Sequence, residues 1–179
     1  SFEGGNPSNK VLRLATRNQS LSYPLLVPEG EKATLFFRAS STTWSRDDVS
    51  LGLADRPAYG YSSASDFEVQ MGRWTGESLG NRSVCLYDGG TSLTDVDVFE
   101  SDVWYRFWAV VDNASDTWGL YVQGGDYTVP TRVDREDDGG TVFGFRNGSD
   151  TLPLARFLIR SPVQGVWNGA EGGFWLDDI

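Results

Sequence analysis

Residues 103–125, "VWYRFWAVVDNASDTWGLYVQGG", decide the fold class. Two runs of alternating apolar and polar residues flank the polar tetrapeptide "NASD" at 113–116, which is the pattern of a β-hairpin. A period of two divides the first run into a core set, Val103, Tyr105, Phe107, Ala109 and Val111, and an opposite set, Trp104, Arg106, Trp108, Val110 and Asp112. Since the opposite set mixes large aromatics with charges, we expect it on the outer or concave face of a sheet.

The same kind of short β-branched and aromatic run recurs along the whole chain. Turn-forming residues separate the runs at 11–14, 33–39, 49–53, 66–71, 83–87, 141–145, 155–159 and 173–176. This spacing predicts an all-β sandwich or barrel, and helix is expected only for a turn or two. Without an internal repeat or a linker, residues 1–179 are predicted to be a single β-sandwich domain, excised from a larger protein.

Charge and composition exclude several classes of function. The formal net charge is -10, and Lys10 and Lys32 are the only lysines. We therefore expect no nucleic-acid partner and no membrane insertion. The sequence has no histidine, which excludes Ser-His-Asp and Cys-His catalysis and imidazole-ligated zinc. An enzyme built on this chain must use carboxylates, Tyr, Lys or Arg.

Acidic residues at the two ends of the chain suggest a metal site. Glu3 lies near the start, and Asp177 and Asp178 follow the last strand-like run. Three converging carboxylates need a cation between them, and Ca²⁺ prefers carboxylate and backbone carbonyl oxygens, which Gly5 can supply. Glu3, Gly5, Asp177 and Asp178 are therefore predicted to bind a structural calcium, provided that the first and last strands pair. The alternative is that Asp177 and Asp178 are a solvated tail.

The stretch 103–125 resembles the Trp-bearing hairpin of laminin-G-like domains, which belong to the concanavalin A-like lectin/glucanase superfamily. "ATLFFRA", "VSLGLAD", "DFEVQMG" and "GFWLDDI" follow in a compatible order. The resemblance implies a jelly-roll β-sandwich of two antiparallel sheets, adjacent terminal strands and, often, a structural calcium. The pair "FEGG" and "LDDI" is also similar to galactose-binding-like carbohydrate-binding modules, so a galactose-binding-like jelly roll is the alternative fold.

The resemblance also supplies a test for catalysis. Laminarinase-type members of the superfamily carry Glu-x-Asp-x-Glu on one strand, where alternate carboxylates face the same glycosidic bond. Here Asp134, Glu136 and Asp138 alternate in a Gly-ended loop, and Glu68 stands alone. Alginate lyases of the superfamily need a histidine that this chain lacks. We therefore predict no catalytic residues, although a fold by itself neither establishes nor excludes an activity.

Aromatic residues beside arginines indicate a carbohydrate site, because sugar rings stack on flat aromatic faces and hydrogen-bond to neighbouring polar groups. The predicted ligand-binding residues are Trp44, Arg46, Tyr59, Tyr61, Arg73, Trp74, Arg106 and Trp108. The first six lie in loops, where they equally well serve as lids over the sandwich, while Trp104 and Trp175 are interpreted as structural. The arginines favour a uronic or sulfated glycan, because guanidinium pairs with carboxylate and sulfate. The net negative charge of the chain opposes binding of such an acidic glycan, and a neutral glycan is equally compatible.

Together these features predict a non-catalytic carbohydrate-binding or adhesion module of an extracellular or cell-surface protein. Its partners would be a polysaccharide or glycan and the other domains of the parent chain. The rival hypotheses are a structural or protein-interaction domain and, less favoured, a carboxylate-based glycosidase or polysaccharide lyase. Four N-x-S sequons, at Asn18, Asn81, Asn113 and Asn147, matter only in a eukaryotic secretory pathway.

Overall fold

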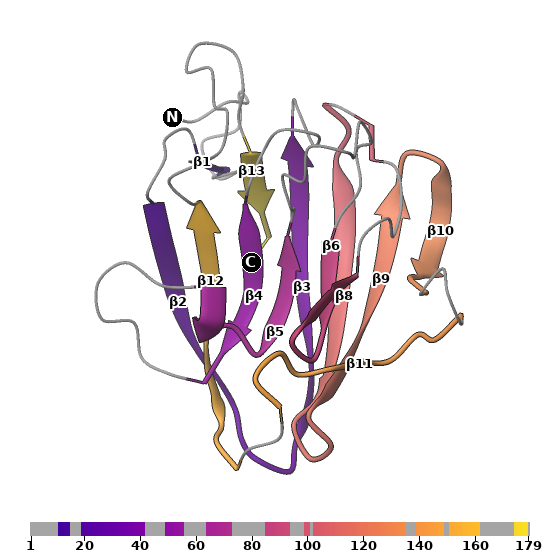
Figure 1. Ribbon diagram of the computed structural model, residues 1–179. Coiled ribbons are helices and arrows are strands. Elements are labelled where there is room, and N and C mark those ends of the chain that lie inside the picture. Colours follow the sequence, from indigo (N-terminus) through magenta and orange to yellow (C-terminus); the bar gives the residue numbers. More distant parts are fainter. Residues whose placement is uncertain are drawn as a thin grey trace.

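A computed structural model shows two antiparallel β-sheets stacked as a sandwich (Figure 1). The structure describes residues 11–14, 19–41, 49–55, 64–72, 85–93, 99–100, 102–134, 139–148, 151–161 and 174–178. Within these ranges the only helix is a single 3-10 turn, Ala64–Asp66, and no helix is long and apolar enough to cross a membrane. The expectation of an all-β fold is confirmed.

In the described part of the chain, sheet A has seven strands in the order β1-β13-β3-β8-β9-β10, with β11 paired to β9. The strands are β1 (Leu12–Leu14), β13 (Phe174–Asp177), β3 (Lys32–Ser41), β8 (Tyr105–Asp112), β9 (Thr117–Gly124), β10 (Tyr127–Arg132) and β11 (Phe143–Gly144). Leu12 lies opposite Leu176 in an antiparallel register, so the first and last described strands pair as expected. The hairpin at 103–125 is also confirmed, since Asp112 lies opposite Thr117 across the four-residue turn.

Sheet B has six strands among the described residues, in the order β2-β12-β4-β5-β6-β7. They are β2 (Gln19–Val27), β12 (Leu154–Ser161), β4 (Ser50–Ala54), β5 (Val69–Gly72), β6 (Cys85–Asp88) and β7 (Thr91–Leu93). The sequence did not predict β2, β7 or β10. Proline explains two of these omissions, because Pro24 and Pro130 interrupt the apolar runs, and both strands lie at sheet edges where a missing N–H is tolerated.

The core lies between the sheets and follows the predicted alternation. Tyr105, Phe107, Ala109 and Val111 are all buried, whereas Arg106 and Val110 on the opposite side of β8 are exposed. Ring contacts fill the core: Phe37 stacks on Phe107 of the same sheet at 5.1 Å and contacts Phe157 of sheet B across the sandwich at 5.9 Å. Arg106 therefore points to the outer face of sheet A, as do the residues directly opposite it on the neighbouring strands.

Two sequon asparagines stabilise the sandwich. Asn113, in the β8-β9 turn, is buried, and its Nδ2 donates to the carbonyl oxygens of Val27 and Leu152, each at 3.2 Å. The Nδ2 of Asn147 donates to the Phe67 carbonyl at 3.2 Å and to Glu68 Oε1 at 2.6 Å. Both amides are thus held by structural hydrogen bonds.

Candidate functional site

Two rows of side chains cross the outer face of sheet A. The first, here called the arginine row, consists of Arg38 on β3, Arg106 on β8 and Gln123 on β9, which lie directly opposite one another in the strand register. The second, the aromatic row, consists of Phe36, Trp108 and Tyr121 on the same three strands. Because side chains two residues apart point to the same face, the two rows lie side by side on the surface.

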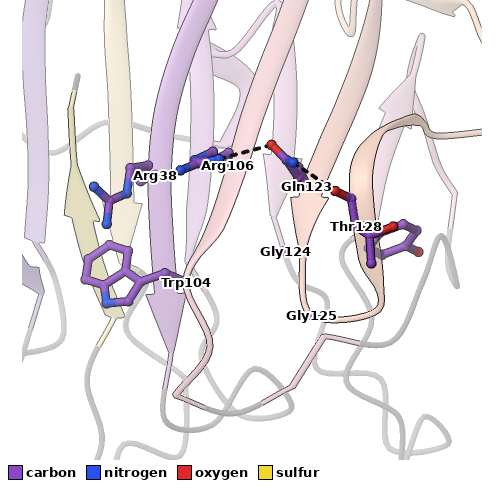
Figure 2. A pocket seen from close by; sticks show the side chains of 8 residues that line it. Arg38, Trp104, Arg106, Gln123, Gly124, Gly125 and Thr128 are labelled. Carbon is purple, nitrogen blue, oxygen red and sulfur yellow. Dashed lines mark hydrogen bonds between the residues drawn. The ribbon is translucent and has the colours of Figure 1, made fainter.

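A hollow of about 330 Å³ opens at the arginine row. Its side chains are Arg38, Trp104, Arg106, Gln123, Tyr127 and Thr128, and Gly124 and Gly125 complete the wall (Figure 2). Two guanidiniums, an amide, two hydroxyls and an indole therefore line one space. This is the mixture of apolar platform and hydrogen-bonding groups that suits a small polar ligand.

The donors on one side of the hollow are fixed by a short chain of hydrogen bonds. Arg106 Nη1 donates to Gln123 Oε1 at 3.2 Å, and Gln123 Nε2 donates to the carbonyl oxygen of Thr128 at 3.1 Å (Figure 2). The Thr128 carbonyl thus orients the Gln123 amide, and the amide oxygen orients Arg106. Such preorganisation lowers the entropy cost of binding.

The opposite side of the hollow is held by Arg38. Its guanidinium carbon lies 5.2 Å from the centre of the Trp104 ring, within the range of a cation-π contact. Arg38 Nη1 also lies 3.6 Å from Asp177 Oδ2 and 3.2 Å from Asp178 Oδ2. The two carboxylates and the indole therefore restrict Arg38 to one orientation.

Gly124 allows Trp104 to lie next to the β9-β10 turn. Its φ of 140° is disfavoured for residues with a Cβ, and a Cβ there would lie 2.6 Å from the Trp104 carbonyl oxygen. The adjacent residue, Gly125, has a φ of 55° in the same turn. The "GG" of the hairpin motif is thus explained by the close packing that forms the wall of the hollow.

A second hollow, of about 240 Å³, lies on the other side of Trp104. It is lined by Val11, Ser40, Asp102, Trp104 and Trp175. Trp104 lines both hollows, so the two are neighbours on this face. An elongated ligand that stacks on Trp104 would extend into both.

The structure describes two of the eight predicted ligand-binding residues. Arg106 lines the hollow, whereas Trp108 is half-buried in the aromatic row, 5.3 Å from the ring of Phe36. Trp44, Arg46, Tyr59, Tyr61, Arg73 and Trp74 lie outside the described residues. Their part in binding stays a prediction.

The sequence analysis missed Trp104, Arg38 and Gln123 as lining residues. Trp104 was interpreted as structural, yet it is only half-buried and lines both hollows. The alternation of 103–112 already placed Trp104 and Arg106 on one face. Arg38, however, is 66 positions away from Trp104 in sequence, and only the β3-β8 register brings the two together.

Of the four predicted calcium ligands, the structure describes Asp177 and Asp178, while Glu3 and Gly5 lie outside the described residues. Asp177 is buried, and its Oδ1 accepts a hydrogen bond from the Asp178 backbone N–H at 3.0 Å. Arg38 already supplies positive charge to both carboxylates. Two carboxylates alone offer fewer oxygens than calcium requires, so the metal stays a prediction that depends on Glu3 and Gly5.

The outer face of sheet B carries the carboxylate that was considered for catalysis. Glu68 is buried and is bound by Asn147, through the backbone N–H at 3.3 Å and through Nδ2 at 2.6 Å. Gln70, also buried, donates to Ser50 Oγ at 3.1 Å and accepts from Arg146. These bonds give Glu68 a structural role. Glu136 and Asp138 lie outside the described residues.

No family model matches the sequence, and no curated protein matches it. Among solved structures, the metal-free form of lectin I-B4 from Griffonia simplicifolia superposes with a TM-score of 0.51 at 10% identity, covering 93% of this chain and 85% of the lectin. The chain has a concanavalin A-like fold. The predicted jelly roll of two antiparallel sheets is therefore confirmed, and the galactose-binding-like alternative is set aside.

Two catalytic domains of glycoside hydrolase family 131 are also similar to the chain. The β-glucanase domain from Podospora anserina has a TM-score of 0.49 at 14% identity, with 94% of this chain and 69% of that domain covered. The domain from Coprinopsis cinerea has a TM-score of 0.49 at 14% identity and 83% coverage of this chain. The chain spans about half of that domain, 54% of its length.

Proposed function

We propose that this domain is a non-catalytic carbohydrate-binding or adhesion module that holds a glycan on the outer face of sheet A. The observation that carries the proposal is the hollow in which Trp104 provides a stacking platform beside the fixed hydrogen-bonding groups of Arg106 and Gln123. Sugars present apolar C–H faces and a rim of hydroxyls, so an aromatic platform with flanking donors matches them.

The shape of the site favours a polymer over a single sugar. The hollow at the arginine row and the second hollow share Trp104 as a common wall, so one sugar can stack on the ring face that Arg38 leaves open while a neighbouring sugar extends into the other hollow. Both hollows open on the outer face of the sheet, where a polysaccharide can lie without threading a chain end. The fold supports this proposal, because the similar Griffonia simplicifolia protein is described as a lectin.

The proposal includes an extracellular or cell-surface location within a larger protein and a structural calcium near the chain ends. The pairing of β1 with β13 supports the calcium, because the chain that precedes Val11 starts from the same end of the sheet as Asp177 and Asp178. Glu3 and Gly5 would then complete the oxygen ligands that these two carboxylates begin.

The experiment is retention of the folded protein on neutral, uronic and sulfated polysaccharides, with calcium and again with EDTA. We expect retention on at least one polymer. A folded protein that binds none of them would refute the proposal.

One observation favours protein interaction as a second candidate function. The edge strand β2 exposes Tyr23 and Leu26, with 63% and 67% of their surfaces accessible. An exposed apolar edge strand can pair with another chain. Crosslinking to co-purifying proteins, compared between the wild type and the Tyr23→Lys variant, would test this second function. If β2 binds a protein partner, the wild type forms a crosslink that the variant loses.

A further inference from the structure

Arg38 and Arg106 lie directly opposite each other on neighbouring strands of sheet A. Both side chains point to the outer face, and both line the same hollow. Like charges at directly opposed positions of an antiparallel pair are destabilising, so this arrangement needs an explanation. Nothing in the core requires it, because the side chains project away from the sandwich interior.

The charges around the pair are arranged unevenly. Across the sheet the order is Asp177 on β13, Arg38 on β3, Arg106 on β8 and the neutral Gln123 on β9. Asp177 and Asp178 compensate Arg38 from one side. In the described part of the chain no carboxylate lies within ion-pair distance of Arg106, whose hydrogen bond goes to the uncharged amide of Gln123.

The two hollows also differ in the charge of the side chains that line them. Of the described residues, Arg38 and Arg106 line the hollow at the arginine row, and no carboxylate does. Among the described residues that line the second hollow, Asp102 is the only charged one, and the guanidinium of Arg13 lies over the ring of Trp175 at 5.6 Å, so the two opposite charges offset each other. A negative group would therefore be favoured on one side of Trp104 and an uncharged, hydroxyl-bearing group on the other.

We propose that the ligand is an acidic polysaccharide whose carboxylate or sulfate binds between Arg38 and Arg106, while a neighbouring uncharged sugar occupies the second hollow. This inference rests on the proposed function and specifies its ligand class. An oxyanion between the two guanidiniums converts their repulsion into two charge-assisted interactions, and the planar fork of arginine matches both oxyanions. The chain carries a net charge of -10, so attraction of a polyanion requires a local concentration of positive charge, which this pair provides among the described residues.

The test compares polymers that differ only in charge. Polygalacturonate is paired with its carboxyl-reduced form, and dextran sulfate with dextran, so that carboxylate and sulfate are separated. Affinity gel electrophoresis of the folded protein measures each Kd. We expect at least one acidic polymer to bind roughly tenfold or more tightly than its neutral counterpart, the effect expected for a charged hydrogen bond.

Two variants with the same change in net charge locate the effect. Arg106→Gln removes one member of the opposed pair, whereas Arg132→Gln removes a guanidinium on β10 that lies over the Tyr121 ring, outside the hollow. We expect Arg106→Gln to abolish the preference for the acidic polymer and Arg132→Gln to retain it. Without ligand, Arg106→Gln should melt at or above the wild-type temperature, because it removes a repulsion.

Each other outcome has a defined meaning. Equal affinity for an acidic polymer and its neutral counterpart would overturn this inference and leave the proposed function standing. Equal losses in Arg106→Gln and Arg132→Gln would show a diffuse charge effect and also overturn it. Absence of binding to all four polymers, and to the wider neutral panel, would refute the proposed function itself.

Discussion

The guanidinium of Arg38 lies over the ring of Trp104, at 5.2 Å from its centre, and the same guanidinium is paired with Asp177 and Asp178. Through these contacts Arg38 on β3 is joined to Trp104, which precedes β8, and to Asp177 and Asp178 at the end of β13. A tryptophan held in this way presents its ring at a fixed angle on the outer face of sheet A. The proposed site therefore depends on a packing relationship between three strands.

Arg38→Met should destabilise the fold by about 1–3 kcal/mol, because it leaves the carboxylate of the buried Asp177 without its counter-ion. Arg106→Met is the matched control, since Arg106 is exposed and its partner is the neutral Gln123. Urea denaturation measures both free energies of unfolding. Equal losses in the two variants would contradict the structural role assigned to Arg38.

Asn113 and Asn147 should carry no glycan when the protein is expressed in a eukaryotic secretory pathway. A glycosylated Nδ2 keeps only one hydrogen, so it would lose a hydrogen bond to Val27 or Leu152 at Asn113 and to Phe67 or Glu68 at Asn147, and chains modified there should fail to reach the folded state. Mass spectrometry of the tryptic or chymotryptic peptides gives the occupancy of each sequon. Full glycosylation of Asn113 in folded protein would contradict the hydrogen bonding described here.

Asp112 should titrate below its ordinary pKa of 3.8. The hydrogen bond from Lys32, with Nζ 2.6 Å from Asp112 Oδ2, is the largest cause of the lowered pKa, and the Ala114 backbone N–H adds to it. A lowered pKa in the folded state means that ionised Asp112 favours folding above pH 3.8 and that this contribution is lost as the pH falls through the lowered value. The Asp112 carboxyl resonance, followed by NMR, should shift its midpoint upward in Lys32→Met. An unchanged midpoint would contradict the assignment to Lys32.

Calcium should raise the melting temperature of the wild type, and EDTA should reverse the increase. A metal that binds only the folded state stabilises it by about 3 kcal/mol at a hundredfold excess over Kd. Glu3→Gln removes a predicted calcium ligand that lies outside the described residues, and the variant should lose the increase. If EDTA leaves the wild-type transition unchanged, Arg38 alone compensates Asp177 and Asp178, and the metal hypothesis is wrong.

The fold could be predicted from the sequence where alternation and turn residues agree. Residues 103–125 predicted the β8-β9 hairpin and the buried and exposed faces of β8, and the structure confirms both. The edge strands β2 and β10 were missed because each contains a proline, and β7 because its residues Thr91–Leu93 follow two glycines and include one large apolar side chain. Local propensity does not predict strands whose pairing depends on a neighbour already in place.

The site was less accessible to sequence reasoning than the fold. Alternation placed Arg106 on the outer face, and the hollow forms there. The opposed arginines, however, depend on the register between β3 and β8, and the orientation of Gln123 depends on the Thr128 carbonyl in the next strand. These relationships are tertiary, and no pattern within either segment encodes them.

The most direct test of the central claim is the affinity of the wild type, Trp104→Ala and Tyr23→Ala for the polysaccharide that retains the protein best. Tyr23 is the matched control, an exposed aromatic residue on β2 of the opposite sheet. Loss of the indole platform should weaken binding roughly tenfold to a hundredfold, the effect expected for one stacked aromatic, while Tyr23→Ala should bind like the wild type. Wild-type affinity in a folded Trp104→Ala variant would contradict a glycan site on the outer face of sheet A.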